Sequence, residues 1–126
     1  MHAPAVAFLT LGCPKNEVDS DRMRAAVSGS NYKVIDDAEN ADVIVVNTCS
    51  FIQAATEESI ETVMGIAAQW LPERAGRKLV VAGCMPSRYG ADLAASMPEV
   101  DAFIPVAEQD ALLDVLARLT DRKSVV

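Results

Sequence analysis

Five short apolar segments recur along the chain and predict the strands of a sheet. Three of them are rich in Val, Leu or Ile with little polar alternation, which is typical of strands covered on both faces. The predicted strands are Ala5–Leu11, Tyr32–Ile35, Ala41–Asn47, Lys78–Gly83 and Ala102–Pro105. All of these runs are far too short to span a bilayer.

Apolar residues also repeat with helical spacing between the predicted strands. The clearest repeat is Ile60, Val63, Met64, Ala67 and Leu71. A second is Leu112, Val115, Leu116 and Leu119, and weaker ones are Met23, Ala26 and Val27, and Tyr89, Leu93 and Met97. Each repeat predicts a helix that buries one side against the sheet.

Capping residues suggest where two of these helices begin. Ser50 with Gln53 forms a capping box ahead of the longest repeat, and Asn16 with Asp19 predicts a cap for the first helix. Only residues 36–40 separate the second and third strands, whereas a parallel crossover normally needs about a dozen residues. We therefore expect a single helical turn there.

Alternating strands and helices predict an α/β fold, a flavodoxin- or Rossmann-like three-layer sandwich. The expected sheet has five mostly parallel strands in the order 2-1-3-4-5, with helices on both faces. Residues 1–120 are expected to form one domain, and residues 121–126 to begin a linker to a further domain.

The charge balance narrows the classes of partner. The net charge is −7, and the 11 Lys and Arg residues are scattered along the chain. An acidic surface repels phosphate backbones, so we expect no direct nucleic-acid binding and a better match to a basic protein. The N-terminus shows no secretory pattern, which makes a cytoplasmic location the default expectation.

Three cysteines occupy equivalent places in the predicted fold. Cys13, Cys49 and Cys84 follow the first, third and fourth strands, at the edge where open α/β sheets bind ligands. In the expected strand order these strands are neighbours, about 4.8 Å apart. The three thiols would then lie within roughly 10 Å of one another on one rim.

Several interpretations of the cysteines remain open at this point. Buried, inert cysteines are common. Structural zinc prefers four protein ligands, and the only histidine is His2. Three thiolates with a free fourth position suit a 4Fe-4S cluster that leaves one iron open.

Three segments around the cysteines resemble the N-terminal, UPF0004-type domain of the methylthiotransferases. These segments are LGCPKNEVDSDRM at Leu11–Met23, ADVIVVNTCSFI at Ala41–Ile52 and VVAGCMPSRY at Val80–Tyr89. Pro14-Lys15-Asn16 and Ser50-Phe51-Ile52 look like the RimO branch, which modifies an aspartate of a small-subunit ribosomal protein. The MiaB-type branch, which modifies transfer RNA, usually has glutamine-methionine-asparagine after the first cysteine and is the alternative.

The resemblance implies that Cys13, Cys49 and Cys84 ligate an auxiliary 4Fe-4S cluster, with Asn16, Asn47 and Thr48 around it. S-adenosylmethionine and a second 4Fe-4S cluster would belong to a radical S-adenosylmethionine domain with a CxxxCxxC motif. This sequence has no such motif. We therefore expect it to contain no catalytic residue, to be inactive alone, and to work with the other domains of the same protein.

Two other classes of function compete with this interpretation. One is a flavodoxin-like binding module in which the cysteines are incidental, although the first loop lacks a phosphate-binding pattern. The other is an interaction module stabilised by zinc. Metal content of the purified protein would discriminate between these classes.

Overall fold

A five-stranded parallel sheet in the order β2-β1-β3-β4-β5 organises the chain. The computed structural model describes residues 5–11, 14–29, 32–48, 53–71, 77–83, 97, 99–105 and 112–120. The strands are β1 (Ala5–Thr10), β2 (Lys33–Ile35), β3 (Val43–Thr48), β4 (Lys78–Gly83) and β5 (Ala102–Pro105). The predicted α/β class and strand order are confirmed, and the bounds of β4 and β5 match the prediction.

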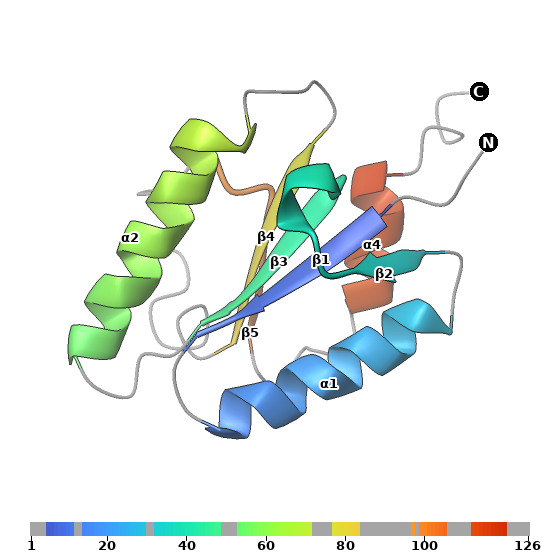
Figure 1. Ribbon diagram of the computed structural model, residues 1–126, viewed down its shortest axis with the longest axis horizontal. Helices are drawn as coiled ribbons and strands as arrows, with labels where there is room; N and C mark the ends of the chain where they lie inside the picture. The colour runs from blue at the N-terminus through green and yellow to red at the C-terminus, as the bar shows by residue number, and fades with distance from the viewer. Residues whose placement is uncertain are drawn as a thin grey trace.

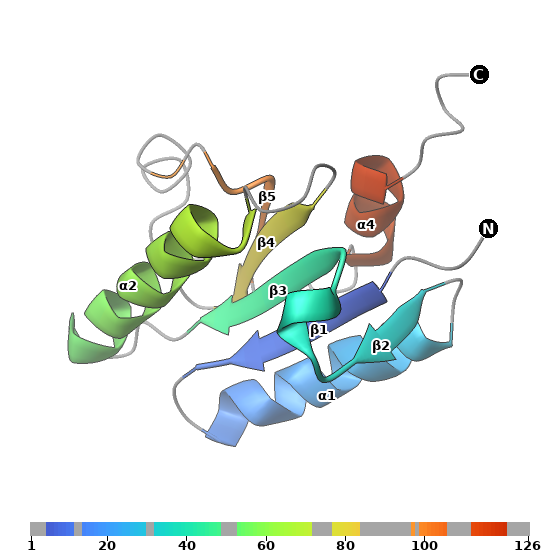
Figure 2. The ribbon, with the colours of Figure 1, turned by 45° about the horizontal axis from the view of Figure 1, so that its top comes forward.

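Helices lie on both faces of this sheet (Figures 1 and 2). They are α1 (Pro14–Ser28), α2 (Gln53–Gln69) and α4 (Leu112–Thr120), together with the short 3-10 turn η1 (Ala38–Asn40). Helices α1 and α4 share one face, and α2 packs on the other. Within the described residues, no helix combines the length and apolar character needed to cross a membrane.

The alternating side chains of the strands divide the core into two layers. The layer under α1 and α4 contains Val6, Phe8, Val43, Val45, Val80 and Ile104. The layer under α2 contains Ala7, Ile44, Val46, Leu79 and Val81. All six side chains of β3 are buried, because this central strand is covered on both faces.

Some details of the helices differ from the predictions. Helix α1 begins at Pro14, so Asn16 lies inside its first turn and does not cap it; Pro suits the first helical position because its fixed φ is already helical. Met64 is 42% exposed and Ala26 is exposed as well. Both were predicted to face the core, but the sheet covers a narrower stripe of each helix. Ser50, Tyr89 and Leu93 lie outside the described residues.

Two aspartates fasten the amino-terminal ends of the strands. The Asp42 carboxylate accepts a hydrogen bond from Ala5 N at 2.9 Å, while Asp42 N donates to Ala5 O. The Asp101 carboxylate likewise accepts from Leu79 N at 2.8 Å, and Asp101 N donates to Leu79 O. Each aspartate thus satisfies both backbone groups at the first residues of a neighbouring strand.

The link between β2 and β3 is the single turn that the sequence predicts. Directly before η1, the Asp37 carboxylate accepts from Glu39 N at 3.1 Å, which closes the turn locally. The turn lies over β1 on the face that also carries α2 (Figure 2). A short turn occupies the place where a crossover helix would usually cover the sheet.

Candidate functional site

Three neighbouring strands end together at the carboxyl edge of the sheet. Thr10 in β1 is the register partner of Asn47 in β3, and Thr48 is the partner of Gly83 in β4. Leu11 N extends the pairing by donating to Asn47 O at 2.9 Å. The backbone at this edge is therefore tied together across all three strands.

Cys13, Cys49 and Cys84 themselves lie outside the described residues. The described backbone nevertheless reaches the residues directly before two of them, and these two residues, Thr48 and Gly83, are register partners. Among the described residues, no group of three His, Cys, Asp or Glu side chains is placed to hold a metal ion. The convergence of the thiols stays a prediction.

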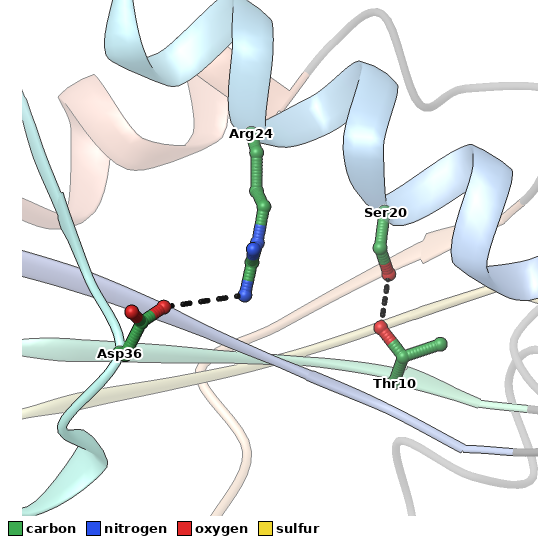
Figure 3. A network of polar contacts seen from close by, with 4 residues as sticks. All are labelled: Thr10, Ser20, Arg24 and Asp36. Atoms are coloured by element: carbon green, nitrogen blue, oxygen red, sulfur yellow. Dashed lines mark hydrogen bonds and ion pairs between the residues drawn. The ribbon is translucent and has the colours of Figure 1, made fainter.

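Ser20 of α1 is the centre of a buried polar cluster at this edge. Its hydroxyl oxygen accepts from Thr10 Oγ1 at 2.6 Å and from Asn47 Nδ2 at 3.0 Å. Figure 3 shows the Thr10 hydroxyl pointing at Ser20 from the end of β1. Ser20 is 3% exposed and Asn47 is fully buried. These bonds join α1 to β1 and β3 next to the positions of the cysteines.

The sequence interpretation overlooked Ser20, although one signal pointed to it. Ser20 shares a helix face with Met23 and Val27, which are both buried in the core. A polar residue on the buried face of a helix needs a partner inside the protein. That partner comes from two strands and is invisible in the local sequence.

Thr48 uses its hydroxyl within the sheet. Its Oγ1 donates to Ala82 O at 2.8 Å, and the residue is fully buried. A threonine hydroxyl carries only one proton, and here the carbonyl of β4 takes it. Thr48 therefore strengthens the joint between β3 and β4 beside the positions of Cys49 and Cys84.

Gly83 closes β4 in a conformation that favours glycine. Its φ is +100°, in the region that side chains with a Cβ rarely adopt. A Cβ at this position would collide with Asn47 Oδ1 and would stand 2.5 Å from Thr48 O. The glycine therefore allows the end of β4 to approach β3 at the residue directly before Cys84.

Charged side chains lie to one side of this edge. Arg24 of α1 forms an ion pair with Asp36 at 3.8 Å, and Figure 3 shows its side chain extending from α1 toward the Asp36 carboxylate. The Asp36 side chain is 96% exposed, so the pair is screened by water and contributes at most about 1 kcal/mol. The Ser20 and Thr48 hydroxyls of this edge are buried, in contrast to this pair.

Comparisons with known proteins cover nearly the whole chain. The model of the uncharacterized protein family UPF0004 matches residues 5–105. A protein of Syntrophus aciditrophicus named ribosomal protein uS12 methylthiotransferase RimO is 41% identical over 123 residues, which is 98% of this chain and 27% of that protein. Proteins with the same name from Synechococcus sp. and Solibacter usitatus are 42% and 44% identical, over 94% and 87% of this chain and 24% and 23% of theirs. The chain spans about a quarter of the length of these curated relatives.

Proposed function

Because this chain belongs to the UPF0004 family, we propose that it is the N-terminal, cluster-binding domain of a RimO-type radical S-adenosylmethionine methylthiotransferase. Cys13, Cys49 and Cys84 are its three cluster ligands. The observation that carries the proposal is the register of Thr48 with Gly83. Two of the cysteines directly follow these paired residues.

Chain geometry limits how far apart these cysteines can be. Adjacent strands lie about 4.8 Å apart, and consecutive Cα atoms are about 3.8 Å apart. A shared cluster on Cys49 and Cys84 is therefore compatible with the register of Thr48 and Gly83, the residues that precede them. Cys13 directly precedes Pro14, the first residue of α1, and the positive end of a helix favours the thiolate form of a nearby cysteine.

The residues around this edge suit a 4Fe-4S cluster. Three thiolates leave one iron open, and a 4Fe-4S cluster bound in this way would supply a site for a sulfur atom on its way to the substrate. Gly83, without a Cβ, lets the end of β4 come close to β3 directly before Cys84. Ser20 fixes the amide of Asn47, which we propose as a neighbour of the cluster together with Asn16, because hydrogen bonds to sulfur tune cluster potential. The Thr48 hydroxyl, bonded to Ala82 O, acts instead on the strand joint.

The complete activity requires more than this chain. We assign S-adenosylmethionine and the second 4Fe-4S cluster to a radical domain elsewhere in the same protein, and the isolated chain is inactive in this proposal. The substrate is an aspartate of a small-subunit ribosomal protein, in keeping with the name of the relatives. The chain itself binds neither nucleic acid nor membrane, and the reaction takes place in the cytoplasm.

Metal analysis under anaerobic conditions tests the proposal. Reconstitution of the 126-residue chain with iron and sulfide should give about four irons and a broad absorbance near roughly 400 nm. Alanine at any one of the three cysteine positions should remove most of the iron. The matched control is Met64→Ala, which alters an exposed side chain on α2 and should leave iron content unchanged.

Two results would count against the proposal. Full iron retention in the variant lacking all three cysteines would rule out the ligand assignment. Zinc at one ion per chain in protein kept free of oxygen throughout would favour the zinc-stabilised module instead.

A further inference from the structure

We propose that an apolar groove between α2 and η1 holds a side chain from a basic segment of the substrate protein. The groove has a volume of about 260 Å³. Ala7 and Leu9 of β1 form its floor, Ile66 and Trp70 form the wall on the α2 side, and Asp36 and Glu39 form the opposite wall. This inference rests on the proposed substrate class, and it is separate from cluster binding.

The groove exists because the link between β2 and β3 is short. A parallel crossover usually contributes a helix that covers the sheet, but this one contributes only η1. Part of β1 therefore stays accessible, and Leu9 is 37% exposed although it belongs to a strand near the middle of the sheet. Leu9 is therefore accessible to a partner in a hollow lined mainly by apolar groups.

Arg77 fixes the two walls relative to each other. Its Nη1 donates to Trp70 O and its Nη2 donates to Glu39 O, each at 2.6 Å. The guanidinium also lies over the Trp70 ring, 4.7 Å from its centre. The groove is thus held open before anything binds, which lowers the entropic cost of binding.

Glu39 and the acidic balance of the chain favour a cationic partner for the groove. Asp36 and Glu39, which line it, are acidic and exposed, and the Arg77 guanidinium lies between the Trp70 ring and Glu39 O. Within the described part of the chain, Asp36 pairs with Arg24 and Glu39 has no ion pair. The whole chain carries a net charge of −7. Lysine or arginine residues beside an inserted apolar side chain would complement this wall.

The groove is small for a cofactor site. Sites for cofactors and drug-sized molecules usually exceed about 300 Å³, whereas this volume suits one large apolar side chain. A peptide segment therefore fits the groove better than a nucleotide or a flavin.

Trp70 provides a direct measurement, since it is the only tryptophan of the chain. Titration of the 126-residue chain with purified ribosomal protein uS12 should change Trp70 fluorescence, provided that the tryptophan content of the added protein is subtracted. Leu9→Glu should weaken binding by about tenfold or more. Glu39→Lys, an exposed substitution that avoids the core, should weaken it as well. The control Asp114→Lys makes the same charge change on α4, across the sheet, and should bind like the wild type.

Each other outcome overturns the inference. Wild-type affinity in both groove variants would mean that the partner docks elsewhere. If the wild-type chain forms dimers, does not bind uS12, and becomes monomeric in Leu9→Glu, then a second copy of the chain is the occupant. In the full-length protein, Trp70 emission that resists quenching and does not change with uS12 would mean that another domain fills the groove. Iron content of the same variants distinguishes the two proposals, because Leu9→Glu should keep its iron even where docking fails.

Discussion

Asn47 Nδ2 in β3 donates to Ser20 Oγ in α1 at 3.0 Å, although the two residues are 27 positions apart in the sequence. The same oxygen accepts from Thr10 at 2.6 Å. One serine therefore satisfies the buried amide of Asn47 and the partly buried hydroxyl of Thr10, directly beside the predicted cluster site. Such a site depends on its supporting groups as well as on its ligands.

Ser20→Ala should destabilise the chain, because it leaves the donors of Thr10 and Asn47 without their shared acceptor. An unsatisfied buried polar group costs about 1–3 kcal/mol. Urea unfolding followed by circular dichroism should show this loss, and reconstituted iron should be less stable to chelators. Ser28→Ala, at the exposed end of α1, is the control. Equal unfolding free energies for the two variants would mean that the hydrogen bonds to Ser20 do not contribute to stability.

Gly83→Ala should be far more harmful than Gly65→Ala. At position 83 the added Cβ would collide with the backbone of Thr48. The alanine would also have to keep a φ of +100°, which alone costs about 1–2 kcal/mol. At Gly65, inside α2, a Cβ meets nothing within 4 Å. Alanine there should stabilise the helix by about 0.5–1 kcal/mol. Opposite shifts in melting temperature are expected, and similar shifts would contradict the strand-end geometry.

Asp42→Ala should lower stability by about 1–3 kcal/mol, because Ala5 N loses a charged acceptor at the start of β1. Asp42→Asn keeps one acceptor oxygen and should recover much of the loss. Arg24→Ala, which removes an exposed ion pair, should cost less than about 1 kcal/mol. Denaturant midpoints of the three variants test this ranking, and an Arg24→Ala effect as large as that of Asp42→Ala would contradict it.

Arg77→Lys should loosen the groove although it keeps the charge. A lysine cannot reach Trp70 O and Glu39 O together as the planar guanidinium does. We expect a red shift of Trp70 emission, greater quenching by acrylamide and a loss of about 1–2 kcal/mol. Lys78→Arg, at the next position, is the control. An unchanged emission spectrum in Arg77→Lys would show that the walls do not depend on this residue.

Much of the fold could be predicted from local patterns. Continuous apolar runs marked the strands, and β4 and β5 have the predicted bounds. The short connection before β3 indicated the turn that became η1. Met64 was misassigned because helical spacing marks a stripe, whereas the width of the sheet decides how much of that stripe is buried.

The amino-acid sequence by itself determined the order of elements, the α/β class and the places of the three cysteines, since these depend on periodicity and on residue type along the chain. Only the tertiary structure decided that Ser20 supports Asn47, that Gly83 must approach Thr48, and that β1 is left open beside Trp70. Those relationships join residues from different strands and helices. They arise from packing and strand register, which a linear pattern does not contain.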